Sequence, residues 1–188
     1  MKRRHLLITL AAVTALTGCG DTSTPTMNTT KVATVDIANL PTLRETQTQM
    51  LELIDQVQAA VSAAVPEVKP WRWNRQWDSS TCIGAPDNGG ATLYFPNLLS
   101  QRALNDTEWD AVFTSVTGIA ATAGLTEISM PQNSPGNHEV RIDSADGREL
   151  ILGSRLTTLI SARISCRRTA GESLYVDGRI PMPPDPQP

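Results

Sequence analysis

Two segments of the chain carry apolar residues at the three- and four-residue spacing of an amphipathic helix. The first follows Thr42, and Glu45 stands three residues later, which is the pairing that closes a capping box. Pro66 and Pro70 then stop the helical pattern. The pattern predicts a first helix whose apolar face contains Leu43, Met50, Leu51, Ile54, Val57, Val61, Ala64 and Val65.

The second helical segment begins at Asn105, a favourable N-cap residue, with Glu108 three positions on. A single apolar stripe follows and stops at Gly124, the residue type that most often terminates a helix. We therefore predict a second helix, whose stripe contains Trp109, Val112, Phe113, Val116, Ile119, Ala120 and Ala123.

Alternation of apolar and polar residues predicts strands in the rest of the chain. Residues 71–77 place tryptophans at odd positions and polar residues between them, and residues 91–95 form a second, shorter candidate. Residues 84–90 are rich in Gly and Pro and form a turn region. We expect these two strands to pair as a hairpin with a long loop, and Cys82 to lie at its edge.

Further strands are predicted downstream of the second helix. Residues 125–130 form a short strand, and residues 131–136 form a loop. Residues 139–143 alternate and lead through the turn dipeptide Asp146-Gly147 into residues 149–152. This arrangement is typical of a hairpin.

The last strand candidate, residues 156–167, alternates most regularly. Its even positions are Leu156, Thr158, Ile160, Ala162, Ile164 and Cys166, and its odd positions are mostly polar. We expect a long, half-buried strand in which Cys166 shares the inward face of Ile160 and Ile164, beneath the helices. Hairpins combined with two amphipathic helices define an α+β fold, with an antiparallel sheet of about four to six strands and both helices on one face.

The amino terminus has the pattern of a bacterial export signal. Lys2, Arg3 and Arg4 precede an apolar stretch from residue 6 to residue 15, and Leu16-Thr17-Gly18-Cys19 then has the form of a lipobox. We expect residues 1–18 to be removed and Cys19 to carry acyl chains such as palmitate, which anchor the protein in the membrane. The paired arginines leave both the general and the twin-arginine export routes open.

The mature chain is acidic and has the size of one domain. Loss of the three basic signal residues lowers the formal charge from −3 to −6, so no nucleic-acid partner is expected. Residues 19–35 are polar and predict a lipidated, flexible tether. Residues 36–180 then form a single domain, and residues 181–188 form an extended, proline-rich tail.

Cysteine usage predicts a disulfide. Because Cys19 is assigned to lipid, Cys82 and Cys166 are the remaining pair, and an exported protein reaches an oxidising compartment. Two buried free thiols are the alternative. The predicted bond would join the last strand to the early hairpin and stabilise the fold by about 4 kcal/mol.

Candidate chemistry is sparse. His5 belongs to the signal, so His138 is the sole histidine of the mature chain, and a lone histidine at the start of a strand is ordinarily a surface or edge residue. The chain has no G-x-S-x-G elbow, P-loop, H-E-x-x-H helix or EF-hand loop. We therefore expect no enzymatic activity, no metal and no cofactor.

The tryptophans offer the best candidate surface. Trp71, Trp73 and Trp77 share one face of their predicted strand, and flat aromatic rings stack on sugars or hold apolar ligands. The competing interpretation is that they pack in the core, since the helices need a large apolar partner.

Together these features resemble the LppA-like lipoproteins of mycobacteria and related actinobacteria. The resemblance rests on the lipobox, the polar tether, a first helix leading to the tryptophan-rich segment with Cys82, and a terminal strand ending at Cys166. It implies a location, the outer face of the cell membrane, and contributes no catalytic residues.

We therefore interpret the protein as a binding or interaction module of the cell envelope, with an envelope protein, a glycan or a lipid as partner. One alternative is a carrier that holds an apolar or lipid ligand between helices and sheet. The other is an envelope hydrolase that uses His138 or a pair of carboxylates.

Overall fold

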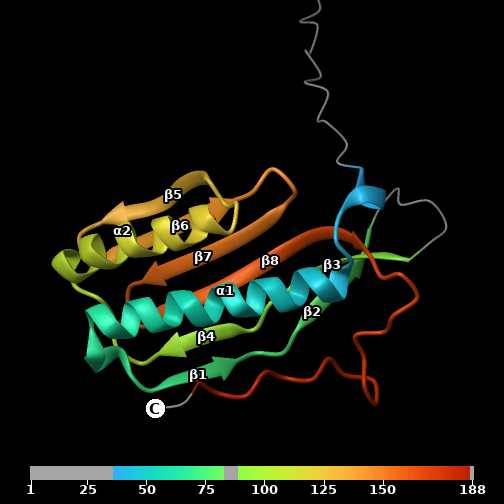
Figure 1. Cartoon of the computed structure of the whole chain (residues 1–188). Helices are drawn as coiled ribbons and strands as arrows, with labels where there is room; N and C mark the ends of the chain where they lie inside the picture. Colours follow the sequence, from blue (N-terminus) through green and yellow to red (C-terminus); the bar gives the residue numbers. More distant parts are fainter. Residues whose placement is uncertain (1–35, 83–88, 187–188) are drawn as a thin grey trace, which may run out of the picture. The chain divides into compact units, whose positions relative to one another are not determined.

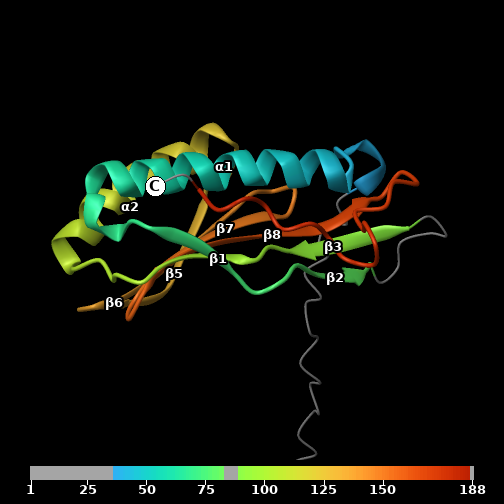
Figure 2. The ribbon, with the colours of Figure 1, turned by 90° about the horizontal axis from the view of Figure 1, so that it is seen from below.

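Two helices cover one face of an antiparallel sheet, as Figures 1 and 2 show. The computed structural model describes residues 36–82 and 89–186. The long helices are α1 (Leu43–Ala64) and α2 (Asp106–Thr122), and the short 3-10 turns are η1 (Ile37–Asn39) and η2 (Pro66–Val68). The strands are β1 (Trp71–Asn74), β2 (Asp78–Thr81), β3 (Gly90–Tyr94), β4 (Asn97–Ser100), β5 (Glu127–Ser134), β6 (Asn137–Asp143), β7 (Arg148–Ser154) and β8 (Thr158–Arg168).

Both predicted helices are confirmed, and each begins with a complete capping box. In α1 the Thr42 side chain accepts from the backbone N–H of Glu45, whose carboxylate accepts in return from the N–H of Thr42. In α2 the pair Asn105 and Glu108 makes the same reciprocal contacts. These caps satisfy backbone donors that a helix start leaves without intrahelical partners.

The α+β class and the placement of both helices on one face are confirmed, but the sheet is larger than expected. It has eight strands in the order β1-β4-β8-β7-β6-β5, with β3 pairing both β8 and β2. The additional strands are short segments, such as β2 and β4, that show little alternation of apolar and polar residues. Sequence periodicity detects such strands poorly because each is only four residues long.

The pairing of the tryptophan-rich segment differs from the prediction. It was expected to pair with residues 91–95, but β1 pairs with β4, and β3 instead forms the hairpin with β2. Arg75 has a φ of 73°, a left-handed conformation that ends β1 after only four residues. The chain therefore leaves one strand pair within the segment predicted as a single strand, and enters another at Asp78, directly after it.

Two further boundaries shift. Strand β5 continues to Ser134 through a segment predicted as a loop, and a register shift between Ser129 and Gln132 accommodates Pro131. Leu156, predicted as an inward strand residue, is 83% exposed in the turn before β8. The β6–β7 hairpin is confirmed, and Gly147 is required in its turn because a Cβ there would lie 1.9 Å from the Oγ of Ser165.

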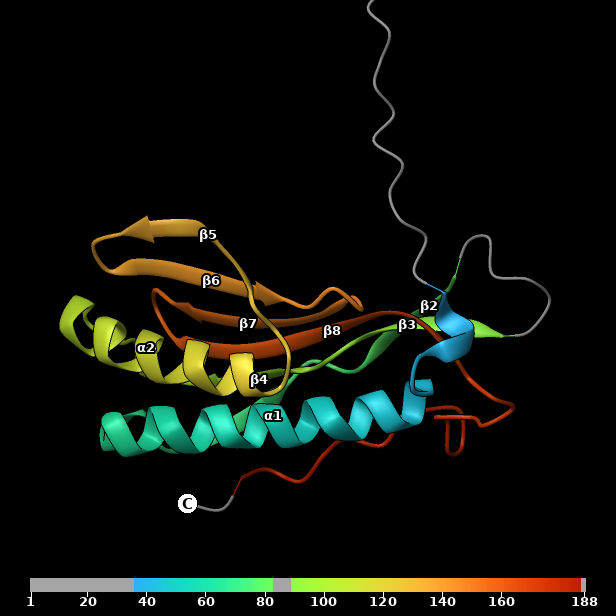
Figure 3. The same cartoon turned by 45° about the horizontal axis from the view of Figure 1, so that its top comes forward.

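The core fills the space between the helices and the sheet. Helices α1 and α2 lie side by side over it (Figure 3). The inward faces of the helices meet alternate residues of the central strands, all buried to within a few per cent of exposure. The fully buried members include Met50, Ile54, Val57, Val61, Val112, Val116, Leu93, Leu98, Leu150, Ile160 and Ile164. Burial of aliphatic side chains contributes about 1.5–3 kcal/mol each, which makes this layer the main source of stability.

A disulfide joins Cys82 to Cys166, with the Cα atoms 5.6 Å apart. The alternation along β8 stops at Ile164 because a register shift follows. Between Ile164 and Arg167 the β8 strand advances three residues, while its β3 partners, from Leu93 to Ala91, advance two. Consequently Arg167 is fully buried, whereas Cys166 is only half-buried and is not part of the helix-facing core. The expected inward face of Cys166 is therefore wrong, while the expected link from the last strand to the early hairpin is present.

Removal of this bond should destabilise the domain. The cysteines are 84 residues apart. A cross-link that closes a loop of that size lowers the conformational entropy of the unfolded chain, which raises the free energy of unfolding by about 4 kcal/mol. We expect the Cys82→Ala/Cys166→Ala protein to lose about that much free energy of unfolding in urea titrations at neutral pH. Reduction of the wild-type protein is the control and should give a similar loss. An unchanged unfolding midpoint in both would contradict a stabilising role.

Candidate functional site

The sheet face opposite the helices is lined by polar side chains in a regular row. The strand register aligns one residue from each of five neighbouring strands: Asp143, Glu149, Arg163, Tyr94 and Asp78, on β6, β7, β8, β3 and β2 respectively. Helices pack on the other face, so this row faces away from the core (Figure 2). The alternation of each strand brings acidic, basic and phenolic groups together on one surface.

Glu149 is the buried centre of this row. Its side chain is only 8% exposed, and its carboxylate lies 3.1 Å from the Nε of Arg163 and 3.8 Å from a terminal nitrogen of Arg141. Arg141 also binds Glu139 at 2.7 Å, and that hydrogen bond raises the pKa of the Arg141 guanidinium. A buried carboxylate is costly unless it is paired, and here two guanidiniums from the flanking strands offset that cost.

A hollow of about 520 Å³ lies over this face. Three arginines, Arg75, Arg141 and Arg163, supply planar donors, and Asp78 and Glu149 supply acceptors. The remaining lining residues are Gln76, Tyr94, Phe95, Asn97, Ile151, Ser161 and Ala162. This mixture of donors, acceptors and one exposed phenol ring suits a polar ligand that can both donate and accept hydrogen bonds.

The tryptophans expected to form one surface are divided between the core and the sheet edge. Trp71 is 2% exposed, and its indole N–H donates to the Oγ of Ser62 on α1 at 2.9 Å. Trp73 and Trp77 are half-buried and pack against the core, and Trp77 contacts Phe95 with ring centroids 4.7 Å apart. Core packing therefore accounts for Trp71 completely and for the other two in part.

The outer sides of Trp73 and Trp77 are in contact with the carboxyl-terminal segment of the same chain. The Trp73 indole donates to the carbonyl of Pro184, and the Trp77 indole donates to the carbonyl of Pro181, both at 3.0 Å. The proline-rich tail forms no helix or strand in the described residues, as its sequence indicates. It nevertheless has defined partners, which the sequence did not indicate.

His138 is buried, contrary to the expectation of a surface or edge residue. Its side chain is 8% exposed and stacks on Trp109, with ring centroids 4.8 Å apart and planes 14° from parallel. Its Nε2 lies 2.9 Å from the Oδ1 of Asp106, and its Nδ1 lies 3.2 Å from the Oδ1 of Asn133. With both ring nitrogens engaged, neither is free to take a proton from a nucleophile.

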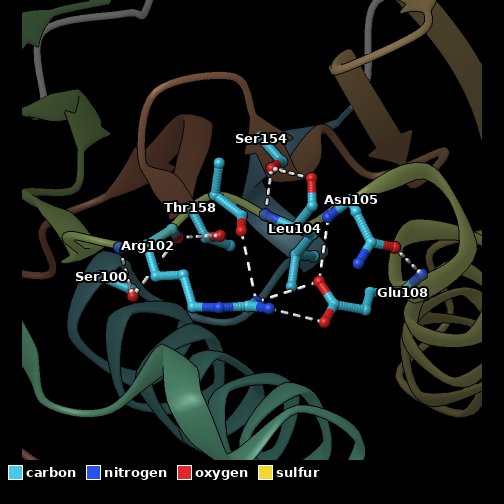
Figure 4. A network of polar contacts seen from close by, with 8 residues as sticks. Ser100, Arg102, Leu104, Asn105, Glu108, Ser154 and Thr158 are labelled. Atoms are coloured by element: carbon cyan, nitrogen blue, oxygen red, sulfur yellow. Dashed lines mark hydrogen bonds and ion pairs between the residues drawn. The ribbon is translucent and has the colours of Figure 1, made fainter.

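The start of α2 is fixed by a polar network around Arg102, shown in Figure 4. The Arg102 guanidinium binds both carboxylate oxygens of Glu108, at 2.6 and 2.9 Å, which lowers the pKa of that carboxyl group. Ser154 accepts from the backbone N–H of Leu104, and Thr158 donates to the carbonyl of Arg102. These contacts attach the α2 start to β7 and β8, and so help to place Asp106 beside His138.

A second buried charge lies at the β6–β7 turn. Arg167 is fully buried and lies 3.1 Å from a carboxylate oxygen of Asp146, which also binds Arg148 at 3.0 Å. Burial lowers the pKa of the Arg167 guanidinium, although the Asp146 charge opposes that effect. This ion-pair cluster connects the turn to the end of β8 and contributes to the fold.

The remaining expected sites are resolved only in part. Cys19 lies outside the described residues. Within residues 36–82 and 89–186, no three His, Cys, Asp or Glu side chains come together as metal ligands. The polar face of Arg141, Glu149 and Arg163 was not singled out from the sequence. Its signal was opposite charges on the polar positions of consecutive strands, but only the register shows that they meet.

The fold defines the class, a small α+β domain in which two helices cover one face of an antiparallel sheet. A family model described as a lipoprotein confined to pathogenic Mycobacterium, the LppA family, matches residues 19–170, and the chain belongs to this family. No curated protein matches.

Two crystal structures have the same fold. Lipoprotein LppA from Mycobacterium tuberculosis is similar at 15% identity with a TM-score of 0.60, covering 79% of this chain and 89% of that one. A protein from Actinomyces odontolyticus, of a domain family without assigned function, is similar at 11% identity with a TM-score of 0.52, covering 80% and 81%. At these identities the likeness shows the fold alone.

The contact between Asp106 and His138 predicts a pH-dependent stability. The backbone N–H of Gly136 donates to Asp106 at 2.7 Å, and this bond, together with His138, lowers the pKa of the Asp106 carboxyl group. A depressed pKa stabilises the fold above the unfolded pKa of about 3.9, and the contribution is lost as the pH falls through the folded pKa. We expect Asp106→Asn to be less stable than wild type at about pH 5, with the difference shrinking towards pH 2.5 in urea titrations.

Asp110→Asn is the matched control for this measurement. Asp110 is exposed on the same helix and has no ion-pair partner among the described side chains. The Asp110→Asn protein should differ little from wild type in its free energy of unfolding at every pH. A constant deficit for Asp106→Asn across the range would contradict the electrostatic account.

Proposed function

We propose that this protein is a lipid-anchored component of the bacterial cell envelope, held by acylated Cys19 with its folded domain outside the membrane. Membership of a lipoprotein family supports this, and the family match begins at Cys19 itself. The disulfide supports it as well, because such bonds persist in oxidising compartments. None of the helices in the described part of the chain is long and apolar enough to cross a membrane. In this proposal residues 19–35 form the tether and residues 36–180 the domain.

The proposed role is recognition of a polar envelope component through the helix-free face of the sheet. The observation that carries this role is the hollow lined by Glu149 and Arg163. Asp78, Tyr94 and Arg141 contribute further donors and acceptors to it from neighbouring strands. The ion pairs that Glu149 makes with Arg141 and Arg163 position these donors and acceptors on the helix-free face. The polar lining favours a glycan or a polar protein surface over an acyl chain.

The other candidate functions have less support. A carrier of an apolar ligand requires space between the helices and the sheet, but the described side chains there, including Met50, Val57 and Ile160, are packed to zero exposure. A hydrolase based on His138 requires a free ring nitrogen beside a nucleophile. Asp106 and Asn133 occupy both nitrogens in the described structure.

The anchor is tested by Cys19→Ala. Without the thiol no acyl chain can be attached, so we expect the protein to move from the membrane fraction to the soluble fraction. Metabolic labelling with an alkyne palmitate analogue measures the modification directly and should be lost as well. The Cys82→Ala/Cys166→Ala protein, which keeps Cys19, is the control and should remain labelled. Unchanged fractionation of Cys19→Ala would contradict the lipid anchor.

The binding face is tested by site-specific photocrosslinking in the native envelope. A photoreactive residue at Ile151, half-buried in the hollow, should yield a defined adduct, and Arg163→Ala should reduce its yield several-fold. The same photoreactive residue at Ala121, exposed on α2, is the control position. Equal adduct patterns from both positions, or an adduct insensitive to Arg163→Ala, would contradict binding at this face.

A further inference from the structure

The carboxyl-terminal residues 181–186 lie along the outer edge of the sheet. Strand β1 pairs only with β4 and therefore ends the sheet on this side. The tail runs antiparallel to β1, since Trp77 contacts Pro181 while the earlier Trp73 contacts Pro184. Figure 1 shows the segment beside β1. The tail thus occupies a position where an additional strand would otherwise bind.

The contacts recognise an extended proline-rich backbone through its acceptors. Two indole N–H groups donate to proline carbonyls, and the backbone N–H of Trp73 donates to the Asp185 carboxylate at 2.9 Å. Arg72 adds an ion pair to Asp185 at 3.6 Å. Proline lacks an N–H and holds φ near −65°, so such a segment presents free carbonyls at a low entropic cost. Aromatic side chains that receive proline-rich segments are a recurring mode of peptide recognition.

The contacts that hold residues 181–186 can be replaced by the same contacts from another segment. The side chains of Arg72 and Asp185 are 60% and 44% exposed, and exposed ion pairs contribute little. Residues 169–180, which lead to the tail, contain one isolated bridge and no helix or strand. Separation of the tail therefore leaves the strand pairing of the sheet intact.

We propose that the Trp73–Trp77 edge is a binding site for an extended proline-rich segment of a partner polypeptide, and that residues 181–186 are its built-in competitor. The partner would supply backbone carbonyls to both indoles and a carboxylate to the N–H of Trp73. The covalent link gives the tail an effective concentration on the order of millimolar, so a partner segment must compete with it. This inference is independent of the role proposed for the opposite sheet face.

Fluorescence anisotropy with a labelled peptide of residues 181–188 tests the site in the full mature chain carrying Cys19→Ala. In that chain Asp185→Ala weakens binding of the chain's own tail. The wild-type peptide should therefore bind the Asp185→Ala chain roughly tenfold more tightly than it binds the unaltered chain. Asp185→Ala in the peptide should weaken its binding to either chain by a similar factor. One substitution thus has opposite effects in the chain and in the peptide, a result that misfolding cannot produce.

Two further measurements complete the test. Asp110→Ala in the chain, which removes an exposed carboxylate far from the tail in sequence, should leave peptide affinity unchanged. Trp77→Phe in the Asp185→Ala chain removes one indole donor and should weaken the peptide several-fold. Equal peptide affinity of the unaltered and Asp185→Ala chains overturns the proposal. A dimer of the unaltered chain that Asp185→Ala dissociates also overturns it, since a second copy would then be the occupant.

Discussion

The alternation of side chains along β8 is the constraint on which the rest of the structure depends. This strand is bonded to β7 on one side and to β4 and β3 on the other, so its pleat sets the faces of its neighbours. Ile160, Ala162 and Ile164 point to the helices, and Arg163 points to the opposite face. The hydrophobic layer and the polar hollow therefore depend on one register. A slip of a single residue would exchange the two faces.

The two faces of the sheet have separate physical roles. On one face burial of aliphatic side chains against α1 and α2 provides stability and leaves little freedom for ligand binding. On the other face charged groups meet in pairs, and Glu149 is buried only because Arg163 and Arg141 flank it. Such a site is held by strands that the core already fixes. The geometry of the hollow is thus a consequence of the packing beneath it.

The sheet ends are protected in different ways. At one end is the exposed strand β5. Pro131 removes a backbone N–H donor from this strand, and the register shift between Ser129 and Gln132 makes the strand irregular. At the other end the tail covers β1, with the Asp185 carboxylate satisfying the backbone N–H of Trp73. Both arrangements limit edge-to-edge pairing between molecules.

The sequence by itself determined the elements whose signals are local. Capping residues and apolar spacing located α1 and α2, alternation located β6 and β8, and the Asp146-Gly147 turn located β7. Each of these patterns reports on residues close together in the sequence. The lone pair of cysteines in the mature domain predicted the disulfide. Tertiary structure alone decided what depends on distant residues. The pairing of β1 with β4, the burial of His138 beside Asp106, and the meeting of Arg141, Glu149 and Arg163 depend on strand register, which no local pattern encodes. The tail on Trp73 and Trp77 belongs to the same group, because an extended proline-rich segment has no periodicity that indicates its partner.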